Sequence, residues 1–275
     1  MSISPTERAV SRPTGPSTSR RTVGLHPTRW APSVILVVAL IAVWESYVRL
    51  AGVSPRILPA PSRVAAQGWA ARDVIAGHAA STLQVTLLGF ALALVVSWII
   101  ATAVDFSPKL RRAVVPLLVV SQTLPIVALA PLMIIWFGFG ILPKLLVVAL
   151  VTFFSMTVGL IEGFASADRE SDRLLRSMGA SRRQQFRYVR LPSAVPRFFT
   201  SLRIGITYAV VGAVFSEYVG ATSGLGIYMS QQKNAFRTDL VLAAVVVTAL
   251  CSIALFLSTY VVERIVAPWA VQEAS

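Results

Sequence analysis

Six long apolar segments, separated by short basic connections, are the feature that most constrains this sequence. A helix needs about 20 mostly apolar residues to cross the hydrocarbon layer of a bilayer, because its backbone hydrogen bonds must be closed within the segment. We therefore predict an all-α membrane protein with six transmembrane helices. The predicted spans are residues 30–48, 80–104, 113–137, 142–161, 202–219 and 240–262.

The composition agrees with a bilayer as the main solvent. Because 55% of the residues are hydrophobic and only 13% are charged, one soluble core of ordinary composition could not hide the apolar surface. The formal net charge of +13 would also suit a nucleic-acid partner, but the basic residues lie between apolar segments, where they set membrane orientation. We expect membrane lipids, and no nucleic acid, among the partners.

The Lys and Arg residues are divided unevenly between the two faces that six spans define. Positive residues near a span are retained in the cytoplasm during insertion. The N-terminal tail, the second and fourth connections and the C-terminus hold 17 of them, whereas the opposite connections hold 7. This bias predicts that both termini are cytoplasmic.

The first 29 residues are rich in Ser, Thr, Pro and Arg, which predicts a disordered cytoplasmic tail. A cleaved signal peptide is the alternative, but the apolar segment that follows is longer than a signal-peptide core and lacks a small-residue cleavage pattern. We assign residues 30–269 to one transmembrane domain, residues 165–197 to a cytoplasmic loop within it, and residues 270–275 to a C-terminal tail.

The fourth connection is patterned as a helical hairpin. Asp168 can cap a first helix, and Gly179 permits the left-handed residue that ends it. Ser181 and Gln184 form a capping box for a second helix. The apolar residues at helical spacing are Leu174, Leu175 and Met178 in the first arm and Phe186 and Val189 in the second. We expect the second helix to stop at Leu191 and Pro192.

Arginines surround the apolar face of this hairpin: Arg176, Arg182, Arg183, Arg187 and Arg190. Attachment to anionic lipid headgroups would account for basic residues at a membrane surface. Lipid attraction does not require a glycine turn with apolar residues on both arms, an arrangement that suits insertion into a groove on another protein. We therefore favour docking to a partner protein.

Residues 173–192 resemble the cytoplasmic "EAA" loop of ABC importer permeases, in which a glycine is followed, after nine residues, by an apolar residue, any residue, Leu and Pro. The sequence departs from the pattern at its opening, where Arg173, Leu174 and Leu175 replace Glu, Ala and Ala, so the ion pair of the family's glutamate is not carried over. The resemblance implies contact with an ATPase through Leu174, Leu175, Met178, Gly179, Ala180, Phe186, Val189, Leu191 and Pro192.

Two further segments, residues 122–144 and 216–228, are similar to the permeases that carry nitrate, sulfonates, taurine and pyrimidine precursors of thiamin. The resemblance implies a MetI-like fold in a bacterial plasma membrane. The partners that it implies are a second permease subunit, most simply an identical copy, a cytoplasmic ABC ATPase dimer and an extracytoplasmic substrate-binding protein. Selectivity would come mainly from the binding protein, and the resemblance of the glycine-rich segments slightly favours a pyrimidine precursor or a related vitamin precursor.

The third predicted span contains three prolines, Pro116, Pro125 and Pro131, which bend helices and could shape a gate or serve only packing. Gln122 in the same segment is a candidate pathway residue. Glu217, which precedes a glycine-rich run on the outer side, is our candidate for admitting substrate or for dimer structure.

Other ionisable residues near the membrane, Glu45, Glu162 and Arg203, lie toward the ends of spans, where snorkelling or a local hydrogen bond is the ordinary explanation. The spans contain no His and no close acidic pair, which argues against a proton relay. The sequence has no Walker A motif and no catalytic or metal-binding constellation, so we expect a transport subunit without enzymatic activity or cofactor. A self-contained secondary transporter or channel is the alternative.

Overall fold

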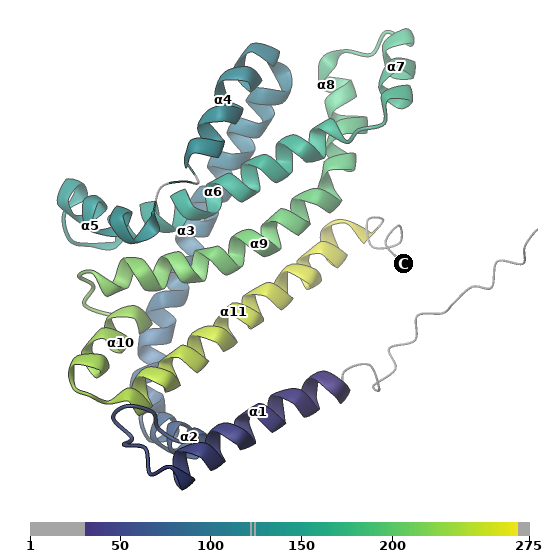
Figure 1. Cartoon of the computed structure of the whole chain (residues 1–275). Helices are drawn as coiled ribbons and strands as arrows, with labels where there is room; N and C mark the ends of the chain where they lie inside the picture. The colour runs from purple at the N-terminus through teal and green to yellow at the C-terminus, as the bar shows by residue number, and fades with distance from the viewer. Residues whose placement is uncertain (1–30, 122, 124, 269–275) are drawn as a thin grey trace, which may run out of the picture.

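The computed structural model describes residues 31–121, 123 and 125–268, and every regular element among them is helical (Figure 1). The helices in chain order are α1 (Ala31–Leu50), α2 (Pro61–Ala70), α3 (Arg72–Phe106), α4 (Pro108–Ser121), α5 (Ile126–Phe137), α6 (Ile141–Ala165), α7 (Arg169–Ser177), α8 (Arg182–Gln185), a π-helical turn (Phe186–Arg190), α9 (Leu191–Tyr218), α10 (Leu225–Asn234) and α11 (Thr238–Val266). The predicted fold class is confirmed.

Five helices in the described part of the chain are long and apolar enough to cross a membrane: α1, α3, α6, the continuous helix that contains α8 and α9, and α11. We call the end of the molecule that carries α7 and α8 the hairpin end, and the opposite end, which carries α2 and α10, the far end. The start of α1 and the end of α11 point toward the hairpin end (Figure 1). The first and last spans, α1 and α11, therefore have their free ends at the same end of the molecule.

The predicted third span, residues 113–137, is wrong as a single helix. The structure divides it into α4, which ends at Ser121, and the short apolar helix α5. Pro125, which precedes α5, has an extended backbone, and it has no N–H to donate to the carbonyl four residues earlier. At 12 residues, α5 is about 18 Å long, too short to cross a hydrocarbon layer of about 30 Å alone.

The core of the molecule lies where α3, α6 and α9 pack along one another. Small residues let these helices approach closely: a Cβ added to Gly163 of α6 would lie 2.9 Å from the backbone of Ala194 in α9. Hydroxyl groups add interhelical hydrogen bonds, since Thr157 of α6 donates to Ser97 of α3 over 3.0 Å. The central helices are thus held by close packing and buried hydrogen bonds.

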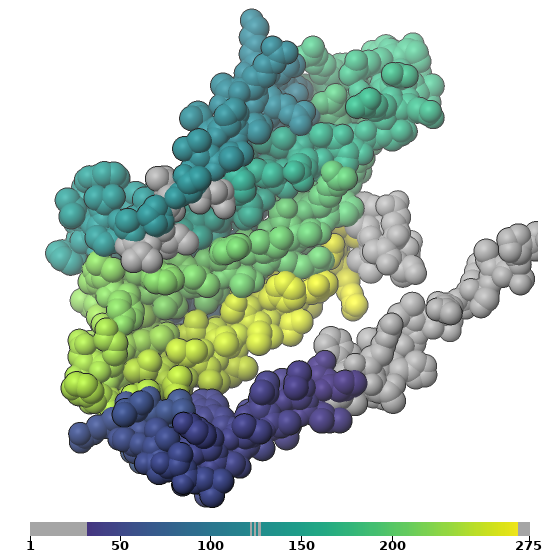
Figure 2. Space-filling model, viewed as in Figure 1, coloured from purple at the N-terminus to yellow at the C-terminus, as the bar shows by residue number. Residues whose placement is uncertain are grey.

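Helix α1 lies apart from this core and is attached near its C-terminal end (Figures 1 and 2). The Glu45 carboxylate accepts hydrogen bonds from the backbone and hydroxyl of Ser62, over 3.0 and 2.7 Å, and pairs with Arg49. The local hydrogen bond expected for Glu45 is therefore present. Most of the apolar side chains of α1 remain exposed in this single chain.

Candidate functional site

The first arm of the hairpin, α7, begins at the predicted cap. The Asp168 carboxylate accepts hydrogen bonds from the Ser171 hydroxyl over 2.7 Å, from the Ser171 backbone over 2.9 Å and from the Glu170 backbone over 3.2 Å. These bonds, those of Ser171 above all, hold the pKa of Asp168 below its ordinary value. An ionised carboxylate therefore fixes the start of α7 at neutral pH.

The turn between the arms also follows the sequence prediction. Gly179 has a φ of +80°, the left-handed conformation that favours glycine, and the Ala180 backbone donates to the Leu175 carbonyl over 2.9 Å. The capping box that starts α8 is complete: the Ser181 backbone donates to the Gln184 side chain over 2.7 Å, and the Gln184 backbone donates to the Ser181 hydroxyl.

The expected end of the second arm at Leu191 and Pro192 is wrong. Helix α8 continues through the π-helical turn into α9, with Pro192 in the first turn of α9. A proline has no N–H and usually kinks or ends a helix, but the wider π-helical turn ahead of it changes the hydrogen-bonding pattern so that the chain continues. The hairpin is therefore joined to a transmembrane helix without an intervening loop.

The predicted apolar face of the hairpin separates into an inner and an outer group. Phe186 packs on Phe164 of α6 and Phe106 of α3, with ring centroids 5.1 and 5.4 Å apart, and Leu191 joins the same cluster. Leu174 and Met178 are instead 61% and 74% exposed. The remaining predicted residues are intermediate or exposed: Leu175, Ala180 and Val189 are half-buried, and Gly179 and Pro192 are exposed.

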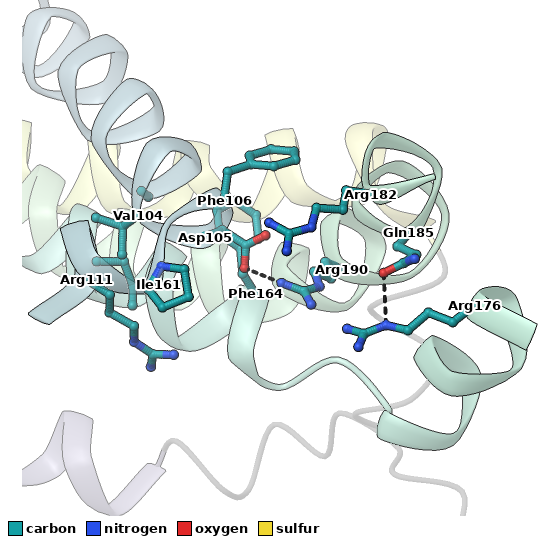
Figure 3. Close-up of a pocket in the computed structure, with 12 residues that line it drawn as sticks. Val104, Asp105, Phe106, Arg111, Ile161, Phe164, Arg176, Arg182, Gln185 and Arg190 are labelled. Atoms are coloured by element: carbon teal, nitrogen blue, oxygen red, sulfur yellow. Dashed lines mark hydrogen bonds and ion pairs between the residues drawn. The ribbon is translucent and has the colours of Figure 1, made fainter. Parts of the chain in front are cut away.

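An ion-pair network attaches the hairpin to the end of α3 (Figure 3). Arg190 pairs with Asp105 over 2.7 Å and lies 3.6 Å from Asp172, which also pairs with Arg176 over 2.8 Å. The buried Gln185 accepts a hydrogen bond from Arg176. Sequence analysis missed the roles of Asp105 and Gln185, because no local periodicity links residue 105 to residue 190.

This network borders a cavity of about 470 Å³ at the hairpin end (Figure 3). Its walls come from the end of α3, the start of α4, the end of α6 and the hairpin. The charged residues that line it are Asp105, Arg111, Arg176, Arg182 and Arg190. We call this space the arginine cavity.

The candidate gate residues lie away from the hairpin. Gln122 falls outside the described residues. Pro125 immediately precedes α5, Pro131 lies within α5, and Pro116 lies within α4. The described geometry brings none of these prolines to the arginine cavity, and their role in a gate stays a prediction.

Glu217 is fully buried at the far end, where it ties three helices together. Its carboxylate accepts hydrogen bonds from the Thr82 hydroxyl of α3 over 2.9 Å and from the Gly226 backbone of α10 over 3.0 Å. The Thr82 hydroxyl in turn accepts from the Leu225 backbone over 2.8 Å. We call this group the far-end tie; a role of Glu217 in admitting substrate or in dimer structure stays a prediction.

Arg203, for which snorkelling or a local hydrogen bond was expected, forms a cross-helix ion pair with Glu263 of α11. Its guanidinium carbon lies 3.9 Å from the centre of the Tyr260 ring. Sequence analysis missed Glu263 because it lies one residue beyond the predicted sixth span. Glu162 is exposed, and its backbone carbonyl accepts a hydrogen bond from Arg197.

Long apolar helices around a close-packed core, with a helical hairpin continuous with one of them, define a multi-pass helical membrane protein. The chain belongs to the family of binding-protein-dependent transport system inner membrane components, whose model matches residues 93–272. It is thus an ABC transporter permease of the inner membrane, as the resemblance implied.

The chain is similar to several curated permeases. It is 35% identical over 84% of its length to the formylaminopyrimidine transport permease protein ThiX of Halalkalibacterium halodurans, covering 92% of that protein. It is 35% identical to the riboflavin transport system permease protein RibX of Chloroflexus aurantiacus, over 86% of this chain and 88% of that one. Against the taurine transport system permease protein TauC of Escherichia coli, the identity is 31%, over 86% and 89%. These relatives are transport permeases, in agreement with a subunit that has no enzymatic activity.

Solved structures support the fold. An amino acid ABC transporter crystallised with histidines matches with a TM-score of 0.60 at 15% identity, over 70% of this chain and 94% of that chain. An inward-facing form of the MetNI methionine ABC transporter matches with a TM-score of 0.60 at 18% identity, over 68% and 93%. The predicted MetI-like fold is confirmed.

Proposed function

We propose that two copies of this chain form the solute pathway of an ATP-driven importer, and that the hairpin binds a cytoplasmic ABC ATPase dimer. The single observation that supports this most is the separation of the hairpin into an anchored base and an exposed tip. Phe186 and the Arg190–Asp105 pair hold the base against α3 and α6, whereas Leu174 and Met178 are exposed at the tip. An exposed apolar group on an anchored support suits insertion into a groove on a separate protein.

The orientation that this proposal requires follows from charge. The hairpin carries most of the arginines of its connection, and positive residues are retained in the cytoplasm. Both termini then lie in the cytoplasm, and the far end faces an extracytoplasmic binding protein. Closure of the ATPase dimer would move the hairpin and rock α9, opening the pathway to each side in turn.

The proposed substrate is a small polar or anionic organic solute, of the nitrate, sulfonate or taurine type or a pyrimidine precursor of thiamin. Relatives at 35% identity include a formylaminopyrimidine permease and a riboflavin permease, and the taurine permease follows at 31%. We favour a pyrimidine precursor or a related vitamin precursor for this reason. Ligand identification on the cognate binding protein is the direct measurement of specificity.

ATPase binding is tested by purifying the tagged chain from its native membranes and identifying any ABC ATPase that accompanies it. Replacing both Leu174 and Met178 with Asp should abolish co-purification, because a carboxylate cannot be buried unpaired in an apolar groove. Leu50→Asp with Ile57→Asp is the matched control, since these residues are 89% and 76% exposed but lie at the end of α1 and in the loop between α1 and α2, at the far end.

Retention of the ATPase by the variant of Leu174 and Met178 would count against the hairpin as the docking element. Vesicle uptake distinguishes the alternative class of protein. In this test, vesicles that contain only the purified chain are given an ion gradient, or a gradient of the solute itself, without ATP or an ATPase. Uptake under these conditions would show that the chain is a secondary transporter or channel and not part of an ATP-driven importer.

A further inference from the structure

The arginine cavity holds more positive charge than its carboxylates neutralise. Four arginines and one aspartate line it, and Asp172 stands just outside. Arg190 is paired with Asp105 and Arg176 with Asp172. Among residues 31–121, 123 and 125–268, no carboxylate lies within ion-pair distance of Arg111 or Arg182. The cavity therefore has two more guanidinium groups than nearby carboxylates.

Such an excess has a physical cost that an anion would remove. Like charges gathered around one space repel one another, and guanidinium groups retain their charge at any physiological pH. Figure 3 shows Arg176, Arg182 and Arg190 reaching the cavity from the hairpin side and Arg111 standing on the other side. A ligand with about two negative charges would offset the excess and bridge the two sides.

We propose that the arginine cavity binds a phosphate group. Planar guanidinium forks match the oxygens of phosphate with paired hydrogen bonds, and a phosphate carries up to two negative charges. The first turn of α4, which supplies Pro108 and Arg111, adds the positive end of a helix to the same wall. The volume of about 470 Å³ lies within the range of about 300–1,000 Å³ that is usual for ligand sites.

The position of the cavity admits two sources of this phosphate. The cavity adjoins the turn between the long apolar helix α3 and α4, the depth at which lipid headgroups would lie. Its hairpin side carries Arg182 at the start of α8, which a free phosphate ester could reach from solution. In both cases the bound group joins α4 to α8 and stiffens the attachment of the hairpin.

Two adjacent pairs of arginines provide matched variants. Arg111 and Arg182 line the cavity, whereas their neighbours Arg112 and Arg183 do not. The test variant is Arg111→Gln with Arg182→Gln, and the control is Arg112→Gln with Arg183→Gln. Both change the net charge equally, so a difference between them reports position and not total charge.

The experiment measures binding to the purified full-length chain in a neutral detergent, by isothermal titration. The probes are inorganic phosphate, short-chain phosphatidylglycerol and, as the zwitterionic comparison, short-chain phosphatidylcholine. We expect saturable binding of inorganic phosphate or phosphatidylglycerol that the test variant weakens by at least about tenfold, since charged hydrogen bonds are lost, and that the control changes less than about twofold. Binding of inorganic phosphate identifies a free phosphate site, and binding of phosphatidylglycerol alone identifies a lipid site.

Three results would overturn the proposal: no saturable binding of either anionic probe, equal weakening by the test and control variants, or unchanged binding in the test variant. If the test variant does not fold, Arg111→Lys with Arg182→Lys replaces it. That variant keeps the charge and loses the planar forks, so weaker binding of the same probe is still expected. None of these outcomes depends on the ATPase or on transport, so they leave the proposed function to its own test.

Discussion

Removal of the Glu217 carboxylate should destabilise the protein far more than removal of an exposed one. Glu217 is fully buried and accepts two hydrogen bonds, from Thr82 over 2.9 Å and from the Gly226 backbone over 3.0 Å. In Glu217→Ala, the Gly226 N–H loses its acceptor, whereas the Thr82 hydroxyl can still donate to the His78 carbonyl. Leaving the buried Gly226 N–H without an acceptor costs about 1–3 kcal/mol, and the cavity left by the lost side chain adds to this, so we expect the free energy of unfolding to fall by about 2–4 kcal/mol.

Glu217→Gln keeps an acceptor oxygen at this position. Glutamine keeps one carbonyl oxygen for Gly226 and places its amide where the other Glu217 oxygen has no hydrogen-bond partner among the described residues. We expect a smaller loss, about 1–2 kcal/mol, because the acceptor oxygen is kept while the buried amide gains no acceptor of its own. Glu162→Ala is the control, because Glu162 is exposed on α6, and it should change the free energy of unfolding by less than about 0.5 kcal/mol.

The assay is reversible unfolding in mixed detergent and dodecyl sulfate micelles, followed by tryptophan fluorescence. A Glu217→Ala variant within about 1 kcal/mol of Glu162→Ala would refute the reasoning, because a buried tie cannot be lost at so small a cost. Equal losses for Ala and Gln would show that an acceptor oxygen at this position does not by itself stabilise the far end.

Three further predictions concern other parts of the fold. The lowered pKa of Asp168 means that its cap stabilises α7 at neutral pH and that this stabilisation is lost as the pH falls below about 4. Hydrogen-exchange protection of α7 should therefore decrease below that pH in the wild type, and Asp168→Asn should show no such step. Gly226→Ala should cost about 1–3 kcal/mol in micelle unfolding because the new Cβ would overlap a backbone carbonyl of α9; Gly77→Ala, which meets open space on α3, should be neutral or slightly stabilising, and equal effects would contradict the clash. Removing either Arg203 or Glu263 should cost about 3–5 kcal/mol by leaving a buried charge unpaired, whereas replacing both with Met should cost clearly less than the sum; additive losses in a double-mutant cycle would exclude the pair.

The features that sequence analysis predicted correctly depend on local signals. Apolar length identified the five helices long enough to cross a membrane. The cap at Asp168, the glycine turn at Gly179 and the capping box at Ser181 each follow from neighbouring residues. The fold class and the family resemblance could therefore be reached without coordinates.

The errors have physical causes that hydropathy does not record. An apolar stretch remains apolar across Pro125, although the backbone there cannot continue a helix, so the third span was predicted as one piece. The opposite error occurred at Pro192, where a π-helical turn lets the helix continue. The pairs Arg190–Asp105 and Arg203–Glu263 join distant segments, and no sequence period identifies them.

The uninterrupted helix from Arg182 to Tyr218 makes the hairpin and the far-end tie two ends of one lever. It has 37 residues, which corresponds to about 55 Å at 1.5 Å per residue. A rotation of about 5° about one end of such a rod displaces the other end by about 5 Å. Since no loop separates the two ends, any tilt not absorbed by bending near Pro192 or Pro196 must shift the buried contacts at Glu217, on the opposite side of the bilayer.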